Sequence, residues 1–394
     1  MQLSHRITNL NGGGSDGWDL FNRARKMIAS GTPVIELTIG EHDIRTAPVI
    51  LQEMHRSAMA GHTGYASVPG IPALRDAIAA RITERTGVKT TRDNISVTSG
   101  GQAALFASHT ATCNQGDTAL FIDPYYATYP GTIRGIGAVP KSLPAFADKG
   151  FQPQAADIRA AGPAASLLIN SPNNPTGVIY TDETLRGIAQ VCRDQDMWLI
   201  SDEVYDTQIW NGQHLSPRAL PDMAARTLVI GSMSKSHAMT GSRIGWIAGP
   251  PDAIEHLINL ATNTTYGVPG YIQDAALFAL NQGPALEAEV AAPFARRRKI
   301  AQDLLAGSNA LRHVPCDGAM YIMLDIRATG MSGEEFAEAL LDAEHIAVMP
   351  GESFGASAAG HLRIAMTVDD ATFKEALTRL IRFAEARIAA HIPA

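Results

Sequence analysis

Short apolar runs alternate with longer stretches of helical periodicity between about residues 95 and 250, and this alternation constrains the fold more than any other feature. Continuous apolar runs of three or four residues, separated by helical segments, are typical of strands buried on both faces of a mostly parallel sheet. The pattern therefore predicts an α/β core with about seven strands. The runs are 95–98, 119–122, 137–139, 166–169, 198–201, 228–230 and 244–247.

Helical patterns flank this core, and a different arrangement follows it. Segments 71–86 and 181–194 have the spacing of helices, and segment 282–308 is long enough to join two domains. The charge run at 296–299, in the middle of the long segment, is interpreted as a solvated face. A strand, a helix, two short strands and a closing helix are expected after it, which indicates a separate α+β layer. Their ranges are 319–326, 333–344, 347–349, 361–366 and 370–391.

The composition excludes several classes of partner. The 32 Lys and Arg residues and 39 Asp and Glu residues give a formal net charge of −7, whereas binding to nucleic acid or to an anionic membrane needs a basic stripe. Cys113, Cys192 and Cys316 are widely spaced and form no metal-binding or disulfide pattern. No apolar run approaches the ~18 residues of a membrane span. We therefore expect a soluble, cytoplasmic protein with no metal, no nucleic acid and no membrane partner.

Three short motifs match known site patterns but lack their structural context. Residues 12–17 fit GxGxxG without a preceding strand, so a flexible loop is expected there. Residues 351–355 fit the GxSxG of serine hydrolases, and a hydrolase that uses Ser353 is kept as a remote alternative. Residues 232–235 fit the SxxK of penicillin-recognising enzymes, but the companion SDN and KTG elements are missing. The lysine of this last motif needs another explanation.

Lys235 follows the apolar run 228–230 and stands among small and hydroxyl-bearing residues, with Arg243 eight positions later. In open α/β sheets, ligands bind beyond the carboxyl ends of the strands. Three other unusual segments also follow predicted strands, so we expect them to meet Lys235 at one edge of the sheet. These segments are 99–102, 170–177 and 201–205.

Eight sequence elements occur in the order and spacing of a known family. They are 37–41, 64–75, 97–105, 123–126, 173–177, 202–205, 234–243 and 361–364. On these residues nearly the whole chain resembles the fold-type I, pyridoxal-phosphate-dependent aminotransferases of class I and II, in particular the bacterial aspartate and aromatic subgroup. The resemblance implies a large domain, 46–284, with a mostly parallel seven-stranded sheet between helices. It also implies a small α+β domain assembled from residues 1–45 and 285–394.

The resemblance implies pyridoxal 5′-phosphate as the cofactor. Lys235 corresponds to the lysine that bonds to the cofactor aldehyde and later moves the substrate proton, and Asp202 to the acid beside the pyridine nitrogen. Asn174 and Tyr205 correspond to the hydrogen-bond partners of the phenolic oxygen, and Tyr126 to the ring that stacks on the pyridine. The implied catalytic set is Lys235, Asp202 and Tyr205. The implied phosphate ligands are Gly100, Gly101, Gln102, Ser232, Ser234 and Arg243, with Tyr65 from the partner subunit.

The same resemblance assigns Arg363, Gly40 and Asn174 to the substrate, with the Arg363 guanidinium holding the α-carboxylate in two parallel bonds. It implies a ping-pong transfer of an amino group from an L-amino acid to a 2-oxo acid such as 2-oxoglutarate or pyruvate. Members selective for dicarboxylates often have a lysine where Gln102 stands, and Tyr266 makes the segment expected from the partner more apolar. The donor is therefore aspartate, an aromatic amino acid or another neutral one.

A homodimer with shared active sites is also implied, because Tyr65 would serve the neighbouring subunit. The charged fraction of 18% lies below the ~25% of an ordinary globular chain and agrees with surface buried between subunits. The nearest alternative function is a pyridoxal-phosphate-dependent carbon–sulfur β-lyase, which shares Lys235, Asp202 and Arg363.

Overall fold

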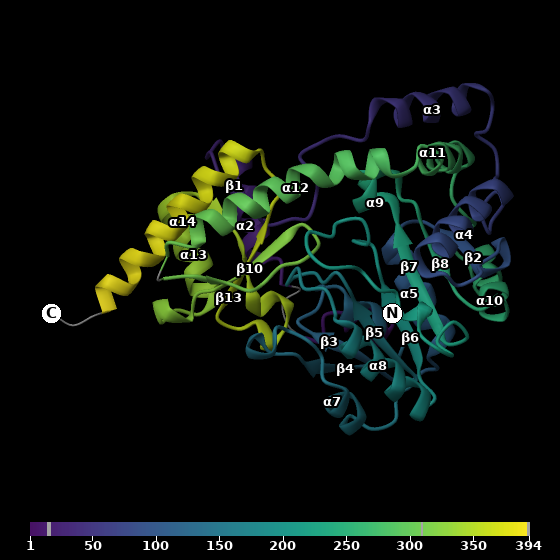
Figure 1. The fold of residues 1–394 in the computed structure, drawn as a ribbon, viewed down its shortest axis with the longest axis horizontal. Helices are drawn as coiled ribbons and strands as arrows, with labels where there is room; N and C mark the ends of the chain where they lie inside the picture. Colours follow the sequence, from purple (N-terminus) through teal and green to yellow (C-terminus); the bar gives the residue numbers. More distant parts are fainter. Residues whose placement is uncertain (14–16, 309, 392–394) are drawn as a thin grey trace.

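The central element of the computed structural model, which describes residues 1–13, 17–308 and 310–391, is a seven-stranded sheet (Figure 1). Its strand order is β2-β8-β7-β6-β5-β3-β4, and β8 alone runs antiparallel to its two neighbours. The prediction of a mostly parallel seven-stranded sheet is therefore confirmed. The strands are β2 (Ile95–Thr98), β3 (Thr118–Asp123), β4 (Val139–Pro144), β5 (Ser166–Asn170), β6 (Trp198–Asp202), β7 (Thr227–Ser232) and β8 (Gly245–Ala248).

Helices cover both faces of this sheet, because neighbouring strand residues point to opposite sides. Leu167 and Ile169 of β5 pack in one apolar cluster with α8, whereas Leu168 packs in another with α5 and α6. A strand that is buried on both faces needs apolar residues at every position, and for this reason the apolar runs in the sequence do not alternate with polar residues. One face carries α5 (Gly101–Thr112), α6 (Tyr129–Gly135) and α10 (Pro251–Thr262), and the other α4 (Pro72–Thr86), α7 (Ala155–Ala160), α8 (Asp182–Asp194) and α11 (Gly270–Asn281).

Another apolar cluster, which includes both ends of the chain, forms a separate layer beside the central sheet. Leu20 and Leu37 pack there with residues of the last hundred positions such as Phe336 and Phe373. Figure 1 shows α12 (Pro284–Leu305) running from α11 to the layer that contains α13 and α14. The division at residues 46 and 284 stays a prediction. The layer contains α2 (Asp19–Ala29), β1 (Ile35–Glu36), β9 (Arg312–His313), β10 (Tyr321–Asp325), α13 (Gly333–Glu344), β11 (Ile346–Ala347), β12 (Met349–Pro350), β13 (His361–Ala365) and α14 (Asp370–His391), while α1 (His5–Thr8) and α3 (Pro48–Met59) lie outside it.

Two local expectations are wrong. The single strand expected at 347–349 is two strands in different sheets, because β11 pairs with β1 and β12 pairs with β13. The charge run at 296–299 is not a uniformly solvated face, since Arg297 is only 2% exposed. Its guanidinium binds the carboxylates of Asp43 and Asp370, at 2.6 Å and 2.9 Å, so its burial is compensated by two ion pairs.

The positions of the weaker motifs argue against their alternative readings. Ser353 lies in the 3-10 turn Gly351–Phe354 between β12 and β13, whereas a hydrolase nucleophile sits on a strand-to-helix turn. Residues 14–16, inside the GxGxxG match, lie outside the described residues. Across the ranges that the structure describes, no helix has the length and apolar character needed to cross a lipid bilayer.

Candidate functional site

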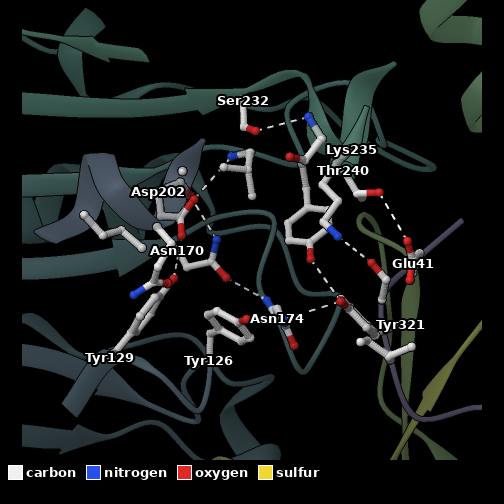
Figure 2. Close-up of a pocket in the computed structure, with 18 of the residues that line it drawn as sticks. Glu41, Tyr126, Tyr129, Asn170, Asn174, Asp202, Ser232, Lys235, Thr240 and Tyr321 are labelled. Atoms are coloured by element: carbon white, nitrogen blue, oxygen red, sulfur yellow. Dashed lines mark hydrogen bonds between the residues drawn. The ribbon is translucent and has the colours of Figure 1, made fainter. Parts of the chain in front are cut away.

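A cavity of about 300 Å³ opens where the parallel strands β5, β6 and β7 end. Asn170 and Asp202 are the last residues of their strands, and Ser232 ends β7 just before the short helix α9 (Met233–Ser236) that carries Lys235 (Figure 2). The carboxyl ends of the strands thus bring the expected segments together. Twelve of the fourteen site residues expected from the sequence line this cavity: Gly40, Gly101, Gln102, Tyr126, Asn174, Asp202, Tyr205, Ser232, Ser234, Lys235, Arg243 and Arg363.

The amine of Lys235 lies inside the cavity and donates a hydrogen bond to the main-chain carbonyl of Gly40. Burial lowers the pKa of this amine to about 8, and the nearby Arg363 and Arg243 guanidinium groups act in the same direction, against the opposing charge of Glu41. An amine with such a pKa is uncharged in a substantial fraction of molecules near neutral pH, and it is then nucleophilic.

Asp202 is held by a residue that sequence reasoning missed. The hydroxyl of Tyr129 donates to Oδ2 of Asp202 at 2.7 Å, and both side chains are buried. Burial raises the pKa of the Asp202 carboxyl to about 6 despite this hydrogen bond. Tyr129 begins α6 in a tyrosine-rich segment, and no pattern in the sequence distinguishes it from its neighbours Tyr125 and Tyr126.

Tyr321 on β10 connects the layer of β10 to the residues that follow the central strands, and the sequence did not predict it. Its hydroxyl lies 3.0 Å from the hydroxyl of Tyr205 and 3.5 Å from Nδ2 of Asn174. A Cβ atom at Gly40 would collide with the same hydroxyl, so only glycine fits where the chain passes Tyr321. The Asn174–Pro175 peptide is cis.

The guanidinium of Arg363 is enclosed between two aromatic rings. Its carbon atom lies 4.6 Å from the ring centre of Tyr321 and 4.3 Å from that of Phe354. One terminal nitrogen donates to Oδ1 of Asn174 at 3.0 Å, and the other donates to the carbonyl of Thr38. Within the described part of the chain, Nε has no hydrogen-bond partner although it is buried. The guanidinium group is therefore held in one orientation, and it can still donate hydrogen bonds to an anion.

Hydrogen-bond donors gather in the cavity at the start of α5. Gly100, with φ +84°, precedes the first turn of α5, and no side chain among the described residues caps the amides there. A Cβ atom at Gly100 would collide with the guanidinium of Arg243, so that group lies directly against the helix N-terminus. Free amides, the helix dipole and a guanidinium together favour an anion such as a phosphate.

Gln102 lines the cavity although its side-chain amide is bound to α6, whereas Gly100 and Tyr65 are the two expected site residues that do not line it. The amide of Gln102 donates to Oγ1 of Thr132 at 2.7 Å and accepts from Oγ1 of Thr128 at 3.0 Å, so α6 holds it. Tyr65 is outside the cavity, 92% exposed, with its ring packed on that of Tyr266 at 5.1 Å.

Asp123 ties the 3-10 turn Ala356–Ala358, which follows Phe354, to the central sheet. It ends β3 and its Oδ1 accepts a hydrogen bond from the amide of Ser357 at 3.2 Å. Burial raises the pKa of this carboxyl from 3.8 to about 6. The folded chain therefore binds this proton more tightly than the unfolded chain, and the ionised carboxyl costs stability as the pH rises from about 4 to about 6.

We expect Asp123→Asn to remove this cost, because the amide oxygen still accepts from Ser357 and cannot ionise. The free energy of unfolding in urea should exceed that of the unmodified protein by roughly 1–3 kcal/mol at pH 7, and the two should converge near pH 4. A difference that is the same at every pH between 4 and 7 would contradict the assigned titration.

Comparisons with known proteins agree with this geometry. The family model described as aminotransferase class I and II matches residues 32–380. An arginine–pyruvate transaminase of Pseudomonas aeruginosa is 39% identical over 383 residues, which cover 96% of this chain and 97% of the relative. The aspartate/prephenate aminotransferase of Thermus thermophilus is 34% identical, with 91% and 93% of the two chains covered.

Solved structures show the same similarity. A single mutant of the Thermus thermophilus aspartate aminotransferase superposes with a TM-score of 0.91 at 31% identity, covering 97% of this chain and all of the other. The aromatic aminotransferase of Pyrococcus horikoshii gives a TM-score of 0.87 at 30% identity, with 92% and 99% covered.

Proposed function

The chain belongs to the class I and II aminotransferases, and we propose that the cavity around Lys235 is where it transfers amino groups. It is a pyridoxal-phosphate-dependent enzyme. Its relatives are named as aminotransferases, and these names do not favour a β-lyase or a serine hydrolase. The observation that carries the site is a buried lysine amine with a pKa of about 8 in one cavity with Asp202 and Arg363.

The residues of the cavity fit the cofactor. The free amides at the start of α5, with Ser232, Ser234 and Arg243, offer donors for the phosphate, and the Asp202 carboxylate can pair with the protonated pyridine nitrogen. When bound, pyridoxal phosphate supplies an aldehyde that bonds to amines and a ring that withdraws electrons from the substrate carbon. Tyr126 lines the cavity where an aromatic ring can stack on the pyridine, and Asn174 and Tyr205 can bind the phenolic oxygen.

The residues of this chain then divide the reaction between binding and proton transfer. Arg363 and the amide of Asn174 bind the substrate α-carboxylate, and this contact orients the α-hydrogen. Lys235, in its uncharged form, would take the proton from Cα of the substrate at Nζ and hold it there for the return transfer. The main-chain carbonyl of Gly40 accepts a hydrogen bond from Nζ when no substrate is bound. Tyr129 acts through Asp202, whose carboxylate it orients.

We propose a donor with a long side chain that ends in an uncharged or positively charged group, with pyruvate as an acceptor. Gln102 is uncharged, and its amide is already bound to Thr128 and Thr132. It therefore offers neither a cation nor a free donor for a distal carboxylate. Beyond Gln102 and Trp18 the cavity adjoins a hollow of about 750 Å³ whose wall includes Glu334 and Glu338. The similar protein named arginine–pyruvate transaminase supports this substrate class.

A matrix of amino acids against 2-oxo acids tests the substrate proposal. We expect kcat/KM for arginine and for phenylalanine to exceed that for aspartate by at least about tenfold. Glu338→Gln should lower kcat/KM for arginine about threefold, the effect of one exposed charge pair, and leave phenylalanine unchanged. Phenylalanine thus serves as the internal control. Aspartate as the best donor would refute the substrate class but not transamination.

We also propose a homodimer in which Tyr65 completes the site of the neighbouring subunit, within the cytoplasm. Tyr65 and Tyr266 form an exposed aromatic pair outside the cavity of their own chain. Large exposed aromatic side chains of this kind are typical of an interface. The three free cysteines agree with a reducing compartment.

Mixed dimers test the shared site. When Lys235→Ala and Tyr65→Ala subunits exchange, each hybrid should contain one intact site and one site with both changes. Activity should rise above that of either parent towards about one quarter of the unmodified enzyme, as random pairing requires. An active monomer in sedimentation, or no gain on mixing, would rule out the shared site.

A further inference from the structure

The chain segment 38–46 crosses from the layer of Arg363 to the loop of Lys235 and binds both. The carbonyl of Thr38 accepts from Arg363, and the carbonyl of Gly40 accepts from the amine of Lys235. Figure 2 shows Glu41 facing Thr240, whose hydroxyl donates to it at 3.3 Å. Thr46 donates to the carbonyl of Ala238 at 2.7 Å. We call residues 38–46 the strap.

His42 lies at the centre of the strap and contacts the backbone of the reacting lysine. It is 8% exposed, and its Nε2 lies 3.0 Å from the main-chain oxygen of Lys235. A carbonyl oxygen can only accept, so Nε2 carries the hydrogen and donates. Burial and the charge of Lys235 lower the pKa of His42 to about 4, so the ring is neutral. Its edge-to-face contact with Phe294, at 5.3 Å between ring centres, holds the ring plane.

The carbonyl of Lys235 needs such a donor. Helix α9 has only the four residues Met233–Ser236, and a helix this short leaves the carbonyls of its last turn without intrahelical partners. The side chain of Gln208 also donates to this carbonyl, at 3.3 Å, which is the longer of the two contacts. The strap therefore holds Lys235 at two points, with the side chain bound to Gly40 and the main chain bound to His42.

We propose that His42 is a positioning residue for Lys235, and that its donation to the lysine carbonyl keeps Nζ where it can reach the substrate proton. This inference rests on the proposed role of Lys235. Without the donor, Gln208 alone binds the Lys235 carbonyl, through the longer contact of 3.3 Å, and the peptide at Lys235 can shift so that Nζ leaves the carbonyl of Gly40. When a proton acceptor is displaced by a fraction of an ångström, the rate of proton transfer falls more than the affinity for substrate.

Three variants test this proposal in the holoenzyme. His42→Phe keeps a ring against Phe294 but cannot donate, and His42→Gln offers an amide donor at a similar reach. Thr46→Val is the matched control, since it removes another strap-to-loop hydrogen bond that does not involve Lys235. We expect His42→Phe to lower kcat about fivefold, the effect of one ordinary hydrogen bond, with KM little changed and a larger isotope effect from α-deuterated substrate. His42→Gln should recover most of the rate, and Thr46→Val should leave kcat and the isotope effect unchanged.

A second readout does not depend on turnover. In the cofactor-free protein, the pH dependence of carbamylation at Lys235 by cyanate, followed by mass spectrometry, reports the pKa of the amine. His42→Phe should move this pKa up from about 8 towards 10.5, because the amine becomes more hydrated, and His42→Gln should not.

The outcomes separate the two hypotheses. If His42→Phe only lowers the melting temperature and leaves kcat, isotope effect and lysine pKa unchanged, the histidine is structural and the inference fails. If Lys235→Ala retains transamination, the proposed function fails instead. Should His42→Phe not fold, the comparison is made between His42→Asn, whose amide stops short of the carbonyl, and His42→Gln; equal rates in these two would overturn the inference.

Discussion

Replacing Lys235 with alanine is expected to reduce the single-turnover rate of amino-group transfer by roughly 10⁴-fold or more, because the chain then has neither the amine that bonds to the cofactor nor the group that moves the Cα proton. Among the described residues that line the cavity, the other basic groups are the guanidinium groups of Arg243 and Arg363, which are poor nucleophiles and poor proton acceptors. The visible absorption that bound cofactor gives the protein should disappear or shift. Both quantities are measured by stopped-flow and steady absorbance spectroscopy.

The control for this substitution is Lys299→Ala. Lys299 is an exposed lysine on α12 that pairs with Asp303 at 3.0 Å, so its loss removes one lysine without touching the cavity. We expect its rate and spectrum to match those of the unmodified enzyme. A Lys235→Ala protein that keeps the absorption band and the transfer rate would show that another amine reacts, and the proposed site would be wrong.

The positions of Lys235, Asp202 and Asn174 could be predicted because each follows an apolar run. Parallel strands bring their carboxyl ends to one edge, and so the order of the runs already places these residues together. Gly40 and Arg363 come from distant ends of the chain, and only the resemblance related them to that edge. The structure supplies the physical link, since Tyr321 contacts Asn174 and Tyr205 and leaves no room for a side chain at Gly40.

The residues that hold the expected groups in place could not be predicted. Tyr129, Tyr321 and Phe354 act through contacts with residues that are distant in the sequence, and periodicity reports only which face of an element is buried. Arg297 was misjudged for the same reason. A run of four basic residues is typical of a solvated helix face, and the carboxylates that bury this arginine come from positions 43 and 370.

Arg363→Lys is expected to lower kcat/KM for every amino acid donor by about 10³-fold, although the positive charge is kept. An ammonium group cannot form two parallel bonds to the α-carboxylate. It also cannot fill the space between the rings of Tyr321 and Phe354, which lie 4.6 Å and 4.3 Å from the guanidinium carbon. Oδ1 of Asn174 and the carbonyl of Thr38 would each lose a donor in a buried place.

The affinity for an unreactive carboxylate separates this role from a general disturbance of the site. Binding of 3-phenylpropionate, followed by its effect on the cofactor absorption, should weaken in Arg363→Lys by a factor similar to that in kcat/KM. The absorption band itself should persist, because the proposed role of Arg363 is to bind the substrate and not the cofactor. Arg327→Lys is the matched control, since Arg327 pairs with Asp325 at 2.6 Å and is exposed at the surface of the same layer. If 3-phenylpropionate binds Arg363→Lys as tightly as it binds the control, the substrate carboxylate must lie elsewhere, and the orientation of substrate across the cavity from Arg363 to Lys235 would have to be abandoned.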